Sequence, residues 1–302
     1  MTDPFAVISA DHSRRDRSAG HESRSIIATE VDHRHALEEL DFRLRIILPE
    51  EYQETYEQLR PAPMKSAGLQ YAADGSVAWD KIWGSFCDLA IAGGPPHKGA
   101  LLGPASTEEI AAAPSRYQDV VDEICRGVTM TTELPATESP VPGWVRVTCY
   151  SETMAAWLYR AIVVENVAVQ AGGRTIDLPA APGFRLEKEI KNVITVIAKT
   201  CHYWMGHMPR EQKESIAILF DSLAKTSPLV EPAAGTGWRG VACASVDDAV
   251  WMMRALVVHN VLARREGTTL FVPVNPAQDA DGVGVAASLE LVRRLRAASL
   301  AA

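Results

Sequence analysis

Two arginine residues stand inside apolar segments of the sequence. Arg160 lies within residues 155–164 and Arg254 within residues 249–258, and the other residues of both segments are aliphatic or aromatic. A helix that is apolar all round is typical of the protein interior. Because a buried guanidinium without a partner costs several kcal/mol, each arginine is expected to have an anion beside it.

Different anions would satisfy these two arginines. A carboxylate or phosphate of a small ligand or cofactor, held between Arg160 and Arg254, would suit the bidentate geometry of the guanidinium group. An internal ion pair with Glu165, Asp177 or Glu189 would instead fix the packing of the chain. A contact within an oligomer is the third alternative.

Four residues could exchange protons with a ligand. Glu165 and His259 each follow an arginine by five positions, so a general base at one site could be matched by a general acid at the other. The alternative is that Glu165 and His259 differ because this position tolerates variation. His202 and His207 lie in the polar and aromatic segment 199–209, where they could transfer protons or belong to a helix end that packs on the core.

Further residues could bind a cofactor or a metal ion. His97 and Lys98 lie in a Gly/Pro-rich loop that could hold an anion, although a rigid connection is the alternative because proline removes amide donors. Cys149 and Cys243 end predicted strands and could bind a soft metal, with Cys201 as a further ligand, act as a redox pair, or be buried thiols. The spacing of Cys201 and the neighbouring histidines matches no zinc motif.

A repeat of forty residues must position these groups. Residues 143–182 align without a gap with residues 237–276, and about seventeen of forty positions are identical where chance would give roughly two or three. The shared residues include both arginines, both strand-ending cysteines and an asparagine that is predicted to cap each helix, Asn166 and Asn260. The sequence therefore predicts an internal duplication.

Each copy is predicted to form a strand, a helix, a hairpin and a second helix. In the first copy the strand covers 144–149, the helix follows Ser151, the hairpin joins 167–170 to 175–179, and the last helix covers 184–203. A strand–helix–strand crossover followed by a hairpin predicts a mixed sheet. We expect an α/β or α+β fold of βαββα-like repeats whose mixed sheet is covered by helices.

The rest of the chain divides around the two copies. Residues 1–36 are polar and predicted to form a mobile tail. Residues 37–141 are predicted to be an α/β region, with a strand over 42–48, and are read either as a separate region or as a decayed third copy. The first clear repeat with its connecting helix covers 142–226, and the second covers 236–302.

Composition, charge and missing motifs argue against several classes of protein. A formal net charge of -8 and an isoelectric point near 5.5 argue against a nucleic-acid-binding protein. No uninterrupted apolar run is long enough to span a membrane, and five scattered cysteines with no secretory signal predict a cytoplasmic protein. The usual hydrolase, zinc-protease and nucleotide-binding motifs are missing.

The sequence leads to one main hypothesis and two alternatives. The main one is a protein that binds a small anionic metabolite or cofactor at the seam between the repeats, with acid–base catalysis there. The first alternative is a non-catalytic subunit or maturation protein whose apolar repeats, marked by Trp144 and Trp238, contact a partner subunit or a second copy. The second is metal handling through cysteine and histidine. No particular cofactor or reaction class follows.

Overall fold

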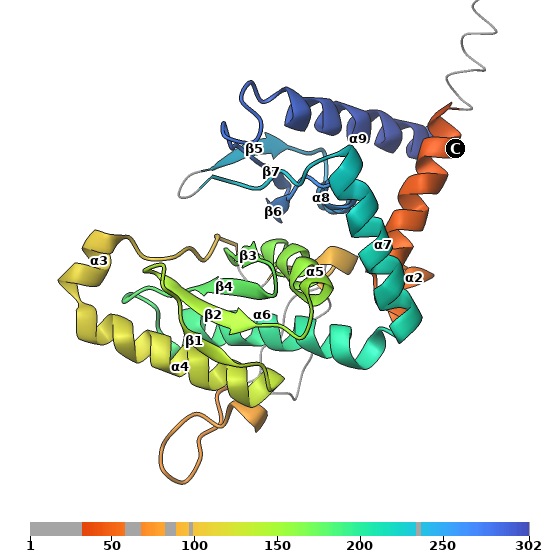
Figure 1. Cartoon of the computed structure of the whole chain (residues 1–302). Helices are drawn as coiled ribbons and strands as arrows, with labels where there is room; N and C mark the ends of the chain where they lie inside the picture. The colour runs from red at the N-terminus through yellow and green to blue at the C-terminus, as the bar shows by residue number, and fades with distance from the viewer. Residues whose placement is uncertain (1–31, 58–67, 82–88, 97–98, 234–236, 302) are drawn as a thin grey trace, which may run out of the picture.

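The computed structural model describes residues 32–57, 68–81, 89–96, 99–233 and 237–301. The fold is mixed α/β and contains two antiparallel sheets. Figure 1 shows one sheet lying over helices α4 and α6, with the other sheet beneath helix α9 at the opposite side of the molecule. Most of the predicted tail, residues 1–31, lies outside the described residues.

The N-terminal part is helical where a strand was expected. Residues 32–47 form a helix, so the prediction of a strand over 42–48 is wrong. Leu40, Leu44 and Ile47 are at most 3% exposed and follow helical spacing, which explains the outcome. The helical segments that follow are α2 (Glu50–Gln53), η1 (Trp79–Lys81), η2 (Ala90–Ala92), α3 (Thr107–Ala112) and α4 (Pro114–Thr132).

The first sheet has the strand order β1-β2-β4-β3. A helix, α5, connects β2 to β3, and a tight turn at Gly173, whose φ is 58°, joins β3 to β4. Ser151 caps α5 by accepting the amide of Met154 at 3.1 Å. The elements are β1 (Ala136–Glu138), β2 (Trp144–Thr148), α5 (Glu152–Val163), β3 (Gln170–Gly172) and β4 (Thr175–Pro179).

The second sheet has the order β5-β7-β6 and the same pairing register as β2-β4-β3. Trp144 pairs with Pro179 in the first sheet, and Trp238 pairs with Pro273 in the second. The turn glycine again has a positive φ, 56° at Gly267. The elements are β5 (Trp238–Ala242), α8 (Val246–Val258), β6 (Arg264–Glu266), β7 (Thr269–Pro273) and α9 (Val283–Ala301).

The sheets are antiparallel, whereas a mixed sheet was expected. In each unit the crossover helix returns the chain to a strand parallel to the first, but the hairpin's second strand then inserts between these two. Every neighbouring pair is thereby antiparallel. Within the described residues, parallel pairing is confined to single bridges, Leu102 with Val167 and Val230 with Val261, outside the named strands.

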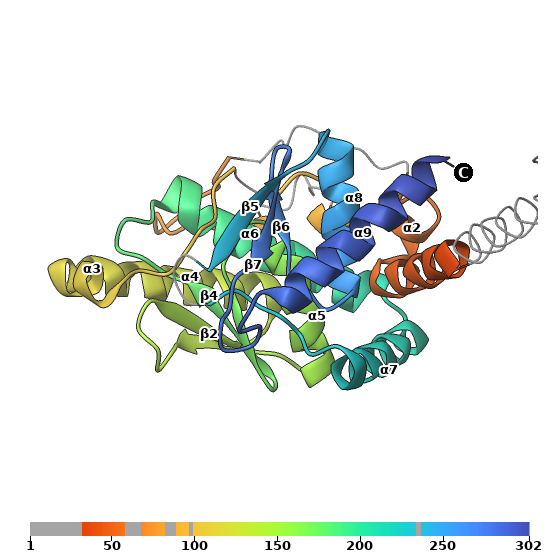
Figure 2. The ribbon, with the colours of Figure 1, turned by 90° about the horizontal axis from the view of Figure 1, so that it is seen from above.

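Long helices complete the core. The segment after β4 contains η3 (Leu186–Ile190), α6 (Lys191–His202) and η4 (Tyr203–His207), and both η segments are π-helical. Helix α6 packs on α4 and α5, and α9 packs on α8. Figure 2 shows α7 (Arg210–Thr226) and the helix of residues 32–47 at the same end of the molecule. In the described part of the chain no helix has the length and hydropathy needed to cross a membrane.

Candidate functional site

Protein atoms bind the two arginines that were predicted to hold an anion. Arg160 is 5% exposed and donates to Oδ1 of Asn260 at 2.6 Å and to the carbonyl of Ala156 at 2.9 Å. Arg254 is 3% exposed and donates to the carbonyl of Tyr56 at 2.7 Å. Burial lowers the pKa of both guanidinium groups to about 10. Neither forms an ion pair with a carboxylate of the described residues.

Aromatic rings also accommodate these two charges. The guanidinium carbon of Arg160 lies 4.0 Å from the ring centre of Phe220, and that of Arg254 lies 5.3 Å from the ring centre of Tyr56. The bond from Arg160 to Asn260 also joins the unit of the first sheet to the unit of the second. The geometry therefore fits a packing role, and a ligand clamp by the two arginines stays a prediction.

Glu165 and His259 occupy matched positions but differ in their partners. Glu165 accepts from Lys199 Nζ at 2.8 Å and from the amide of Ala90 at 2.9 Å, and the two side chains of the ion pair are 0% and 1% exposed. Burial raises the pKa of Glu165, and the Lys199 charge opposes that rise. Burial lowers the pKa of His259 to about 4. Neither residue lines one of the cavities described below.

A π-helical turn brings His202 and His207 together. Their Nε2 atoms are 3.0 Å apart, and Nδ1 of His207 lies 2.6 Å from Oε2 of Glu51 in α2. The ring of Tyr203 contacts both imidazoles. Partial burial, and then the neighbouring His207, lower the pKa of His202. Two of the four predicted proton-transfer residues are therefore neighbours, and they lie at least partly open to solvent.

The cysteines are placed as protonated thiols. Cys149 and Cys201 are buried and lie close enough to interact electrostatically, whereas Cys243 follows β5 in the other sheet. Burial raises the pKa of Cys149 to about 12 and also raises those of Cys201 and Cys243. Because the thiolate is the form that binds metal, this setting disfavours ligation. Within the described residues no group of three or more His, Cys, Asp or Glu side chains could hold a metal ion.

The predicted anion-binding loop lies partly outside the described residues. His97 and Lys98 both lie outside the described residues. The segment before His97, residues 89–96, does contact the units described above. The amide of Ala90 binds Glu165, and Nη2 of Arg265 donates to the carbonyl of Gly94 at 3.4 Å.

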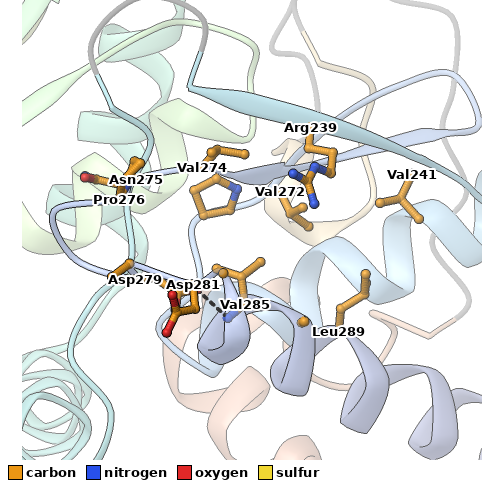
Figure 3. A pocket seen from close by; sticks show the side chains of 14 residues that line it. Arg239, Val241, Val272, Val274, Asn275, Pro276, Asp279, Asp281, Val285 and Leu289 are labelled. Carbon is orange, nitrogen blue, oxygen red and sulfur yellow. Dashed lines mark hydrogen bonds between the residues drawn. The ribbon is translucent and has the colours of Figure 1, made fainter.

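A cavity of about 410 Å³ opens between the second sheet and α9. Figure 3 shows the side chain of Arg239 above Val272 on the side that faces α9, with Asp279 and Asp281 at the N-terminal end of that helix. The side chain of Arg239 is exposed and makes no hydrogen bond or ion pair with any residue that the structure describes. The lining residues are Arg239, Val241, Val272, Pro273, Val274, Asn275, Pro276, Asp279, Ala280, Asp281, Gly282, Val285, Ala286 and Leu289.

The same face of the first sheet contains no arginine. Val145 stands there at the position of Arg239 and pairs with Leu178 as Arg239 pairs with Val272. Val145 and Leu178 are both 0% exposed beneath packed helices. An exposed arginine thus stands in the second sheet where the first sheet has a buried valine, and the cavity beside it is the kind of concave, mostly apolar site with a few polar groups that binds small ligands.

The two carboxylates of this cavity have different surroundings. Asp279 accepts the amides of Gly284 and Val285, each at 3.0 Å, and thereby caps the first turn of α9. Asp281 makes no hydrogen bond or ion pair with any described residue. The cavity therefore presents one unpaired cation, one unpaired carboxylate and an apolar floor.

A smaller cavity, about 260 Å³, lies at the seam between the two units. Trp144 and Trp238 both line it, together with Val163, Val167 and other mostly apolar residues. Trp144 is 7% exposed and Trp238 is half-buried, so these tryptophans do not form the large exposed apolar patch that a partner-binding surface around them would need.

Comparison with known proteins finds no match for the chain among protein-family models, curated proteins or solved structures. The function must therefore be argued from the sites themselves.

Sequence reasoning missed Arg239 and Glu51. Arg239 could have been noticed, because the alignment of the two copies places it opposite Val145, at an inward position of a strand. Glu51 gives no such signal, since nothing in the sequence connects α2 with a turn more than 150 residues later.

Proposed function

We propose that this protein binds a small molecule that carries a carboxylate or phosphate on an apolar body, in the cavity between the second sheet and α9. The observation that supports this proposal is the unpaired guanidinium of Arg239 above an apolar floor. Guanidinium suits both kinds of anion because its N–H groups match two oxygens at once. Binding, and not a particular reaction, is the proposal.

The surrounding residues restrict the ligand further. Val241, Val272 and Leu289 would contact its apolar part, while the anionic group pairs with Arg239. Asp281 would repel a second anionic group and would accept a hydrogen bond from an N–H or O–H group. The preferred ligand thus has one anionic end and, at the other end, a hydrogen-bond donor or a positive charge.

Replacement of Arg239 by valine tests the proposal, because valine is the residue at the matched position of the first sheet. The full chain is titrated calorimetrically with phenylacetate, phenyl phosphate and the neutral analogue phenylacetamide. We expect the anions to bind the native chain and the Arg239→Val variant to bind them about 10- to 100-fold more weakly, as the loss of a charge-assisted hydrogen bond predicts. The native chain and the Arg239→Val variant should bind the neutral phenylacetamide with similar affinity.

The matched control is Arg294→Gln, which removes a positive charge from α9, the helix that borders the cavity, at a position that does not line it. It should keep the affinity of the native chain. Equal anion affinities in the native chain and in Arg239→Val would contradict the proposal, as would an equal loss in both variants, because the latter would reflect net charge alone.

The original seam hypothesis stays as a second candidate. The cavity between Trp144 and Trp238 favours it, whereas the internal partners of Arg160 and Arg254 do not supply free donors. Arg160→Lys and Arg254→Lys would weaken ligand binding if the arginines held the anion. The homo-oligomer, the partner subunit and the acid–base role of Glu165 and His259 likewise stay predictions.

We also propose that the two units arose by duplication of one βαββ segment. The matching registers of β2-β4-β3 and β5-β7-β6 support this origin. So do the left-handed asparagines at equivalent helix ends, with φ of 62° at Asn166 and 61° at Asn260. On this proposal the cavity at Arg239 is a feature that only the second copy acquired.

A further inference from the structure

The pairing of His202 with His207 depends on an unusual turn of helix. Residues five apart point in different directions on an α-helix, but a π-helical turn contains more residues and places them on one face. The segment Tyr203–His207 is π-helical and continues α6 directly from His202. π-Helical turns are often found at functional sites.

The distance between the two imidazoles suits a shared metal ion. With metal–nitrogen bonds of about 2.0–2.1 Å, two Nε2 atoms 3.0 Å apart subtend an angle of about 94° at the metal. An angle near 90° fits neighbouring positions of a square-planar or tetragonal complex and is smaller than the tetrahedral angle that Zn²⁺ prefers. The two Nε2 atoms share a hydrogen bond in the structure, so a metal ion would take the place of the proton between them, and each ring would tilt so that its lone pair points about 43° off the line between the nitrogens.

Glu51 holds His207 in the form that a metal requires. The carboxylate oxygen 2.6 Å from Nδ1 accepts the N–H there, so Nε2 is the nitrogen left to bind a metal. Metal-binding histidines commonly donate their other N–H to a carboxylate in this way, which fixes the tautomer and makes the imidazole more basic. The pair is also accessible, since the His207 side chain is 36% exposed.

We propose that His202 and His207 form a binding site for Cu²⁺ or Ni²⁺, with Glu51 as the positioning residue and water or a small ligand at the remaining positions. Two protein ligands are consistent with the lack, within the described residues, of a group of three or more potential ligands. Both ions bind imidazole well and accept square-planar or tetragonal geometry. The cysteines are not part of this site.

The test uses the full chain after removal of metal with EDTA. Titration with CuSO₄ or NiCl₂ is followed by calorimetry, and the Cu²⁺ complex by electron paramagnetic resonance. We expect one site that shows tetragonal Cu²⁺ with two imidazole nitrogens. His202→Gln and His207→Gln should each lower the affinity at least 10-fold, and Glu51→Gln should lower it about 10- to 100-fold.

Two controls separate this site from other histidines and from misfolding. His35→Gln removes an exposed histidine, whose side chain is 81% exposed, and should leave the affinity unchanged. All variants should unfold at the native temperature without metal, while added Cu²⁺ should raise that temperature most in the native chain. Equal Cu²⁺ affinity in the native chain and the two histidine variants, or no binding by the native chain, would overturn the proposal.

Discussion

The buried ion pair of Glu165 and Lys199 allows a sharp test of the core. Replacement of Lys199 by methionine leaves a carboxylate in a site that is 0% exposed, and replacement of Glu165 by leucine leaves an ammonium group there. Breaking one partner of a buried pair costs about 3–5 kcal/mol. Each single variant should therefore lose that amount of unfolding free energy, or melt roughly 10 °C lower.

The double variant shows whether the loss in each single variant comes from an unpaired buried charge. In Glu165→Leu/Lys199→Met neither charge of the pair remains buried, so the protein should regain most of the loss, although the amide of Ala90 then lacks its carboxylate acceptor and the buried Arg265 loses a nearby negative charge. Urea unfolding of the four proteins yields the coupling energy of the pair. With a loss of about 3–5 kcal/mol in each single variant and about 1–2 kcal/mol in the double variant, the coupling should be at least about 4 kcal/mol.

The exposed pair Arg210–Glu214 is a matched control, because its nitrogen–oxygen distance is also 2.8 Å while its side chains are 86% and 59% exposed. A cycle with Arg210→Met and Glu214→Leu should give a coupling of at most about 0.5 kcal/mol. The reasoning would be refuted if both cycles gave the same coupling, or if Lys199→Met cost less than about 1 kcal/mol.

Two more predictions concern Asn260 and His259. Asn260→Gly keeps the left-handed backbone but removes the acceptor of Arg160, so urea unfolding should show a loss of about 1–3 kcal/mol. Glu133→Gly, at an exposed residue with φ of 60°, should instead be neutral or stabilising by up to about 1 kcal/mol; a loss there equal to that of Asn260→Gly would refute the assignment. Burial, followed by the Arg43 charge, lowers the pKa of His259 to about 4, below its unfolded value, while Glu39 opposes the shift. Stability should therefore fall as the pH drops from about 6.5 towards 4, by about 2 kcal/mol at pH 5. The His259→Phe variant should lack this contribution to the pH dependence of the unfolding free energy. If the variant lost as much unfolding free energy between pH 8 and pH 5 as the native chain does, the assignment to His259 would be wrong.

Local signals in the sequence predicted much of the fold. Ser151 caps α5 as expected, the turn at Gly173 has the positive φ that a tight hairpin needs, and Asn166 and Asn260 end their helices in the left-handed conformation. These features depend on a few neighbouring residues, so sequence reasoning reaches them. The mixed sheet was wrong because strand order depends on where the hairpin inserts, which no local pattern specifies.

The partners of charged residues were harder to predict than their burial. Arg160 and Arg254 are buried as their apolar neighbours indicate, but the proposed internal partner Glu165 binds Lys199 instead. Arg160 finds its acceptor one hundred residues away, in the asparagine that ends α8. Burial follows from composition along one helix, whereas a partner follows from the packing of two distant units.

The contact between His202 and His207 was also not predicted, although these two residues are close in the sequence. The spacing of His202 and His207 matched no metal motif because such motifs assume α-helical or extended backbone. The residues needed were visible in the sequence, but the π-helical turn that brings them together was not. The sequence also gave no reason to connect either histidine with Glu51.

The π-helical turn also sets the number of residues between the two histidines. A π-helical turn holds one residue more than the α-helical turn that it replaces. Loss of a single residue between His202 and His207 would restore α-helical winding, and the two histidines, then four positions apart, would still share one face of the helix. In evolution the side-by-side placement of the two imidazoles can therefore outlast a one-codon deletion that removes the π-helical turn.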